Sequence, residues 1–297
     1  MLREGLGEHS AFGEYHPLIN LTYYIFAIGV TVFSLSPGFL VTTFLLAWVY
    51  SVMLRGTSAM RMNLIFILWI IVVMALINVL FTHQGETVLF CLHGNRITAE
   101  ALIYGLSAAV MLSAVLIWFT SFNAVMTAEK LIYLFGRAAP VLGLTLSMIF
   151  RYIPLLKNRY EEIRMGQRCM GRGAASDPTF LQRLRQDGRN VSVLISWSLE
   201  SSIENADSME ARGYGLKGRT SFHLYRFTAG DAAMEIWLCA LGAVCVCGCV
   251  LDRTDAFFYP RYIPHPLDGG ATVTLAAFAC LLATPIVLDL LGERKWK

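Results

Sequence analysis

Long apolar segments recur along the chain, and their lengths are the first indication of its fold. An α-helix rises about 1.5 Å per residue, so about 20 apolar residues cross a hydrocarbon core of about 30 Å. Six apolar segments reach or approach this length: Leu18–Leu35, Phe39–Met53, Met62–Phe81, Ala101–Thr120, Ala232–Leu251 and Gly270–Leu290. The pattern therefore predicts an all-α membrane protein with about six transmembrane helices.

Local signals refine the arrangement of these segments. Ser36-Pro37-Gly38 separates the first two and predicts a tight turn between paired spans. In the fourth segment, Gly105, Ala109 and Ser113 recur at four-residue spacing. Small residues on one helix face let another helix approach closely, so we expect a neighbour to pack there.

The middle of the chain has the pattern of long charged and amphipathic helices. Charged residues punctuate Leu155–Gly173, where Gly171 is one of two glycines expected to end a helix. A second, amphipathic helix is predicted to run from an N-cap at Asp177 to Arg212, with Gly213 and Gly215 as its C-terminal stop. We expect these helices to lie in the cytosol or across the inner membrane surface.

The segment Leu131–Pro154 is apolar but shorter than a span. Its apolar core, Ala138–Phe150, is too short to cross the bilayer, and Pro140 and Pro154 are expected to break helices. The interpretation is a pair of helices lying at, or dipping into, the inner face of the membrane.

Composition and charge support this division. The chain is 56% apolar and 15% charged, whereas soluble domains have about 45–50% apolar and about 25% charged residues. The segment 130–226 holds 15 of the 24 Lys and Arg residues but only 8 of the 21 Asp and Glu residues. Short loops rich in Lys and Arg face the cytoplasm, so the basic segment and both termini are predicted to be cytoplasmic.

Three regions follow from these patterns. We expect about four spans in residues 1–120, a cytoplasmic or interfacial helix module in residues 121–231, and two spans in residues 232–297. Met1–Pro17 lacks the basic region and cleavage site of a signal peptide, so the first span should be retained. The seven cysteines lie mostly in apolar runs and are expected to be reduced and buried.

Two Arg-Gly pairs are the candidate functional residues. Arg172-Gly173 and Arg212-Gly213 both fall at the end of a charged helix. A single arginine there often does no more than complement the helix dipole. The repetition favours a paired docking device, since a guanidinium group can engage carboxylates and carbonyl groups of a partner protein.

Other chemistry is not indicated. The acidic residues Glu200, Glu204 and Asp207 have no nearby histidine, and salt bridging to arginines or to a partner is the preferred reading over a metal site. The motifs of nucleotide hydrolysis, of a nucleophile elbow and of a zinc protease are missing from the sequence. We therefore expect neither an enzyme nor a resident cofactor or metal. Few charged residues lie within the spans, which disfavours an ion-coupled carrier.

Several motifs resemble one known family. They are His16-Pro17, Arg151-Tyr-Ile-Pro154 before a charged helix, and Ala211-Arg212-Gly213 followed by Tyr214-Gly215. With the apolar spans on either side, they resemble the transmembrane T component of energy-coupling-factor transporters, the EcfT/CbiQ family. The resemblance covers nearly the whole chain.

The resemblance implies a scaffold in the cell membrane of a prokaryote. Its cytoplasmic coupling helices would dock through two arginines into two ABC-type ATPase subunits, which hydrolyse ATP. Its membrane part would hold a small S component that binds the substrate, with vitamins and transition-metal ions as the usual cargo classes. Such a protein has the lipid bilayer around it and no nucleic acid as a partner.

The first docking motif departs from the family pattern, which is commonly Ala-Gln-x-Ala-Arg-Gly. This chain reads Gly166-Gln167-Arg168-Cys169-Met170-Gly171-Arg172-Gly173. Aligned on Gln167, the arginine position falls on Met170, whereas the Arg-Gly pair itself points to Arg172, with Arg168 as a further candidate. The residues that the resemblance assigns to docking are Arg212, Ala211, Gly213, Arg172, Gly171, Gly173 and Arg168.

Two other classes of function stay open. A membrane enzyme acting on a lipid-linked substrate could use the basic segment to bind anionic headgroups. A self-contained carrier would need no partner. Turnover or transport by the purified chain alone would support one of these alternatives.

Overall fold

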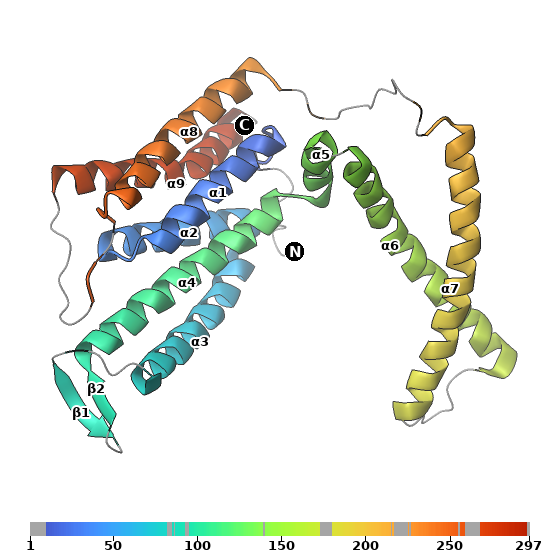
Figure 1. Cartoon of the computed structure of the whole chain (residues 1–297), viewed down its shortest axis with the longest axis horizontal. Helices are drawn as coiled ribbons and strands as arrows, with labels where there is room; N and C mark the ends of the chain where they lie inside the picture. The colour runs from blue at the N-terminus through green and yellow to red at the C-terminus, as the bar shows by residue number, and fades with distance from the viewer. Residues whose placement is uncertain are drawn as a thin grey trace. The chain divides into compact units, whose positions relative to one another are not determined.

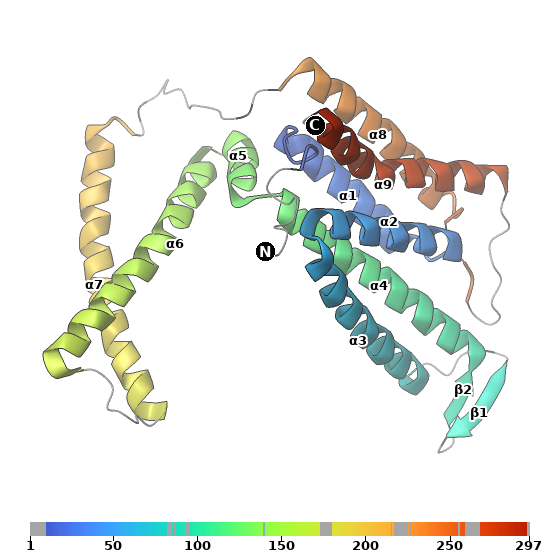
Figure 2. The ribbon, with the colours of Figure 1, turned by 180° about the vertical axis from the view of Figure 1, so that it is seen from behind.

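A computed structural model describes residues 10–81, 85, 87–92, 95–138, 140–172, 180–214, 216, 225, 227–254, 256–258 and 268–295. The chain divides into two compact units. The first unit, called here the membrane body, contains Met1–Lys130 and Tyr225–Lys297, and the second contains Leu131–Leu224. Figures 1 and 2 show the elements of each unit.

Helices make up nearly all of the described secondary structure, so the predicted all-α class is confirmed. The membrane body contains α1 (Pro17–Phe33), α2 (Pro37–Arg55), α3 (Thr57–Phe81), α4 (Ala99–Val125), α8 (Ala229–Val250) and α9 (Gly269–Lys295). Each of the six predicted spans lies on one of these helices. A short antiparallel hairpin, β1 (Val88–Leu92) and β2 (Asn95–Thr98), precedes α4 and was not expected.

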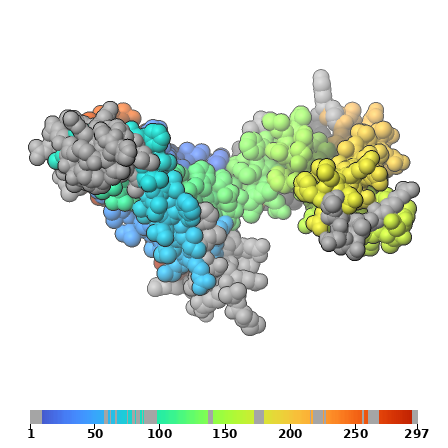
Figure 3. Space-filling model, turned by 90° about the horizontal axis from the view of Figure 1, so that it is seen from below, coloured from blue at the N-terminus to red at the C-terminus, as the bar shows by residue number. Residues whose placement is uncertain are grey.

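Among the described helices, four are long and apolar enough to cross a membrane: α2, α4, α8 and α9. The apolar parts of α1 and α3 are shorter, at Pro17–Phe33 and Asn63–Asn78. The chain is therefore a multi-pass membrane protein. Large apolar side chains are exposed along α3, part of whose surface Figure 3 shows in light blue. They include Leu64, Ile65, Leu68, Trp69, Val72, Leu76 and Phe81.

Helix α4 is the central element of the membrane body, because it packs against α1, α2 and α3, while α9 packs against α2 and α8. The predicted small-residue face of α4 is buried at Gly105, Ala109 and Ser113. A Cβ atom on Gly105 would lie 3.0 Å from the Cβ of Asn78 on α3. The close neighbour predicted from the spacing is thus α3.

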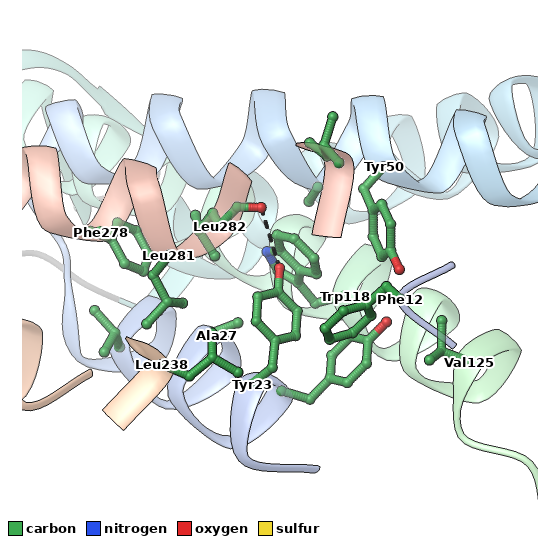
Figure 4. Close-up of a cluster of buried hydrophobic side chains, with 14 of the residues drawn as sticks. Phe12, Tyr23, Ala27, Tyr50, Trp118, Val125, Leu238, Phe278, Leu281 and Leu282 are labelled. Atoms are coloured by element: carbon green, nitrogen blue, oxygen red, sulfur yellow. Dashed lines mark hydrogen bonds between the residues drawn. The ribbon is translucent and has the colours of Figure 1, made fainter. Parts of the chain in front are cut away.

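An aromatic cluster around Trp118 forms the core of the membrane body (Figure 4). The Trp118 ring centroid lies 5.9 Å from that of Tyr23 and 6.0 Å from that of Tyr50. Trp118 Nε1 donates a hydrogen bond of 3.1 Å to Thr43 Oγ1, and the Tyr23 hydroxyl donates one of 3.3 Å to the Leu282 carbonyl. The first bond joins α4 to α2, and the second joins α1 to α9. Both give buried polar atoms of the core a hydrogen-bond partner.

The cysteine prediction is wrong in part. All six cysteines whose side chains the structure describes are free thiols, but only Cys245 among these six is buried. The exposed ones are Cys169, Cys239, Cys247 and Cys280. An apolar run in a membrane protein can face lipid as well as protein, so position in such a run does not imply burial.

The second unit contains most of α5 (Ala128–Ala138), then α6 (Pro140–Gln167), a π-helical turn η2 (Arg168–Arg172) and α7 (Phe180–Ala211). Helices α5 and α6 meet at Gly136 and Gly143, whose backbones are in direct contact. Because neither residue has a side chain, the chain can reverse sharply there.

The prediction of a helix break at Pro154 is wrong, since α6 continues through it. Pro140, in contrast, opens the helix, where its fixed φ angle and missing N–H are tolerated. Pro154 deprives only the Phe150 carbonyl of its intrahelical bond, and both residues are exposed, so solvent can reach this part of the helix. The apolar segment before Pro154 and the charged segment after it are thus one helix.

Candidate functional site

Helices α6 and α7 pack against each other (Figure 2), and polar side chains contribute to their contact. The Tyr160 hydroxyl donates a hydrogen bond of 2.8 Å to Asp187 Oδ1. This bond favours the neutral phenol and is the main cause that raises the pKa of Tyr160. Nearby, the Arg159 guanidinium lies 4.7 Å from the centroid of the Trp197 ring.

Away from these contacts the two helices leave large apolar side chains uncovered. Those more than half exposed are Val141, Leu142, Ile153, Met165, Met170, Phe180, Leu181, Leu184, Ile195, Leu199 and Ile203. Two helices alone have no second layer to cover such residues. Uncovered apolar surface on this scale is typical of a surface that binds a partner or a membrane.

The C-terminal end of α7 is a complete Schellman motif, which ends the helix as predicted. Gly213 has a φ of 72°, in the left-handed region that favours glycine. The Tyr214 N–H donates to the Met209 carbonyl at 3.0 Å, and the Gly213 N–H donates to the Glu210 carbonyl at 2.9 Å. The motif fixes the backbone around Arg212.

Arg212 is the last residue before this left-handed glycine. Its own N–H still donates to the Ser208 carbonyl, at 3.2 Å, so its backbone is held by the helix. The side chains of Arg212 and Ala211 are exposed. A cation at this position complements the negative end of the helix dipole and stands free to bind another protein.

The π turn that continues α6 also contains a left-handed glycine, with a different residue order around it. Gly171 within η2 has a φ of 71° and a ψ of 9°. Met170 therefore precedes the left-handed glycine of α6, as Arg212 precedes that of α7. Arg172 follows the glycine, and Gly173 lies outside the described residues. Arg168 is exposed in the first position of the π turn.

Charges differ between the two helix ends. Along the last turns of α7 the acidic residues are Glu200, Glu204, Asp207 and Glu210, all of them exposed. The last turns before Met170 carry Arg164 and Arg168, also exposed, and Glu161 and Glu162 lie exposed just before these arginines. Within the described residues the only ion pair joins Arg159 to Glu162 at 2.6 Å. The acidic residues of α7 are thus not paired with arginines of the same helices there.

The residue types that bind metals do not gather at this site. Over the part of the chain that the structure describes, no group of three or more His, Cys, Asp or Glu side chains is arranged to hold a metal ion. What the site offers is exposed helix ends with fixed backbones, apolar side chains and uncompensated charges. Such features suit contact with another protein.

Comparison with known proteins identifies the family. A model of the CbiQ family, described as cobalt transport protein, matches residues 14–223. The energy-coupling factor transporter transmembrane protein EcfT of Listeria innocua is 32% identical over 191 residues, which are 60% of this chain and 71% of that protein. EcfT of Bacillus subtilis is 25% identical over 189 residues, 60% of this chain and 71% of that protein. The match spans most of the chain, including both helix ends, and the chain therefore belongs to the CbiQ family.

Proposed function

We propose that this chain is the T component, the transmembrane scaffold, of an energy-coupling-factor importer. In this role it hydrolyses no ATP itself. It docks two ABC-type ATPase subunits at the ends of α6 and α7 and holds a small membrane S component that binds the substrate. The relatives named EcfT support the class of transporter, and the fixed, exposed end of α7 is the observation that carries the docking role.

Docking at helix ends suits the transmission of force. The backbone of Arg212 is held by the Schellman motif, so a push on its side chain moves the whole of α7 rather than a loose loop. Tyr160 and Asp187 join α7 to α6, so the two helices respond together. ATP-driven movement of the ATPases would in this way reach the membrane body and the S component.

The proposed orientation follows the charge rule. The basic segment 130–226 lies on the cytoplasmic side, where ATP is available, and both termini lie there too. The S component is assigned to the membrane body, because the exposed apolar side chains along α3 suit a membrane-embedded neighbour. The membrane is the cell membrane of a prokaryote, and a vitamin or a transition-metal ion is the class of cargo.

Charge reversal at the helix ends tests the docking role. The chain is co-expressed with the ABC-type ATPases of its source organism, and the ATPase that co-purifies from the membrane is quantified. Arg172→Glu combined with Arg212→Glu should leave the chain in the membrane but remove the ATPases, since attraction becomes repulsion. Arg183→Glu with Arg185→Glu, at exposed positions elsewhere on α7, is the matched control. Undiminished co-purification of the first double variant would refute the docking role.

A further inference from the structure

We propose that Met170, rather than an arginine, is the residue of α6 that enters an ATPase groove, and that this groove is apolar with an acidic rim. The inference rests on the docking role proposed above and goes further, since it assigns the contact residue and the chemistry of its partner.

The two helix stops give the register. Gly171 and Gly213 have φ angles of 71° and 72°, so each marks the point where its helix turns into the left-handed region. The residue before that point is the last one whose Cα follows the helix. It is Arg212, directly after α7, and Met170 in η2, the π turn that continues α6. Arg172 lies two residues further along, beyond the turn.

The surroundings of Gly171 indicate that this residue serves to set the backbone conformation. A Cβ atom at Gly171 would have no neighbour within 4 Å, so glycine is required there by its φ angle and not by crowding. The glycine thus sets the direction in which the chain leaves α6.

Met170 has the properties of a buried contact that lacks its partner. It is 61% exposed, and Met165, one and a half turns earlier, is 67% exposed. A methionine side chain is apolar, flexible and polarizable, so it fits irregular apolar pockets and gains little from water. Two such residues at the tip of a charged helix favour a protein groove as the place where they are buried.

The acidic rim of the proposed groove is inferred from the arginines near Met170. Arg164 and Arg168 are exposed on the turns that lead to Met170, and they would face carboxylates around an apolar groove. The α7 end is the reverse, a cation at Arg212 with Glu204, Asp207 and Glu210 on the preceding turns. The two ends therefore require grooves of different chemistry.

Affinity measurements on single variants test the assignment. The full chain in lipid nanodiscs is titrated with the purified ABC-type ATPases of its source organism. Met170→Glu should weaken binding by about tenfold or more, because a carboxylate would enter an apolar groove with an acidic rim. Met170→Leu keeps an apolar side chain of similar size and should change the dissociation constant by less than about threefold. Arg172→Glu should cost less than Met170→Glu, and Arg212→Glu reports on the docking role itself.

The outcomes separate the two claims. If Arg172→Glu weakens binding as much as Met170→Glu or more, the assignment of Met170 is overturned while the docking role stands. Equal affinity of Met170→Glu and the unchanged chain for the ATPases overturns it too. If Arg212→Glu also binds the ATPases normally, the docking role falls together with the inference.

Discussion

The ammonium nitrogen of Lys130 lies 2.6 Å from the carbonyl oxygen of Gly13 and 2.8 Å from that of Val125. Val125 is the last residue of α4, so the cation caps the negative end of the central helix. Burial lowers the pKa of Lys130. Lys130 is also the last residue of the membrane body before the second unit, and it ties the segment before α1 to the point where the chain leaves that body.

Lys130→Met should lower the melting temperature of the purified protein. The substitution keeps most of the apolar stem but leaves two carbonyl oxygens without their charged donor, at a cost of about 1–3 kcal/mol. Thermal unfolding in detergent measures the effect. Lys157→Met, at an exposed position on α6, is the control and should leave the melting temperature unchanged. Equal melting temperatures for the two variants would show that the Lys130 contacts contribute little.

Asp289→Asn should loosen the segment before α1. The Asp289 carboxylate accepts hydrogen bonds from Ser10 Oγ at 3.0 Å and from the Phe12 N–H at 2.9 Å. The neutral amide keeps the shape but loses the charge-assisted part of both bonds. Hydrogen–deuterium exchange should rise in peptides covering residues 10–16. Asp252→Asn, at an exposed residue, should leave their exchange unchanged, and equal exchange in the two variants would contradict the prediction.

Gly213→Ala should destabilise the end of α7. An L-residue in the left-handed region costs about 1–2 kcal/mol, and the new Cβ would lie 3.0 Å from Leu216 Cδ1. Gly188→Ala, in the same helix and with no neighbour within 4 Å of its Cβ, should instead stabilise α7 by about 0.5–1 kcal/mol. Hydrogen exchange in peptides from α7 distinguishes them. Changes of the same sign for both variants would contradict the helix-stop geometry.

Gly248→Ala should separate α8 from α9. A Cβ atom at Gly248 would collide with the side chain of Thr274 on α9, so the helices must shift, at a cost of about 1–3 kcal/mol. Gly29→Ala on α1, where a Cβ meets nothing within 4 Å, is the control. We expect a lower melting temperature for the first variant only. If both melt like the parent protein, α8 and α9 are less closely packed than described here.

Much of the fold could be predicted because membrane helices are long and uniformly apolar. All six predicted spans lie on helices, and the small residues around Gly105 do mark a close contact with α3. The rule that proline breaks helices failed at Pro154, where exposure makes the lost hydrogen bond tolerable. The contacts of Lys130 and Asp289 join residues far apart in the chain, and no local pattern points to them.

The two helix ends were predictable to different degrees. At the end of α7 both Gly213 and Gly215 were candidate stops, and the left-handed residue is Gly213, directly after the arginine that was predicted to end the helix. At the end of α6 both Gly171 and Gly173 were candidate stops, and the choice between them decides whether Met170 or Arg172 takes the terminal position. Only the backbone geometry shows the left-handed residue to be Gly171.

The proposal that α7 docks an ATPase through Arg212 is tested most directly by photocrosslinking. The reactive residue p-benzoylphenylalanine is placed at Ser208, an exposed position one turn before Arg212, and the complex is irradiated in native membranes. We predict a covalent adduct with an ABC-type ATPase that disappears when Arg212→Glu is added, and no such adduct from the exposed mid-helix position Ser192. An absent adduct, or one that survives Arg212→Glu unchanged, would contradict the account.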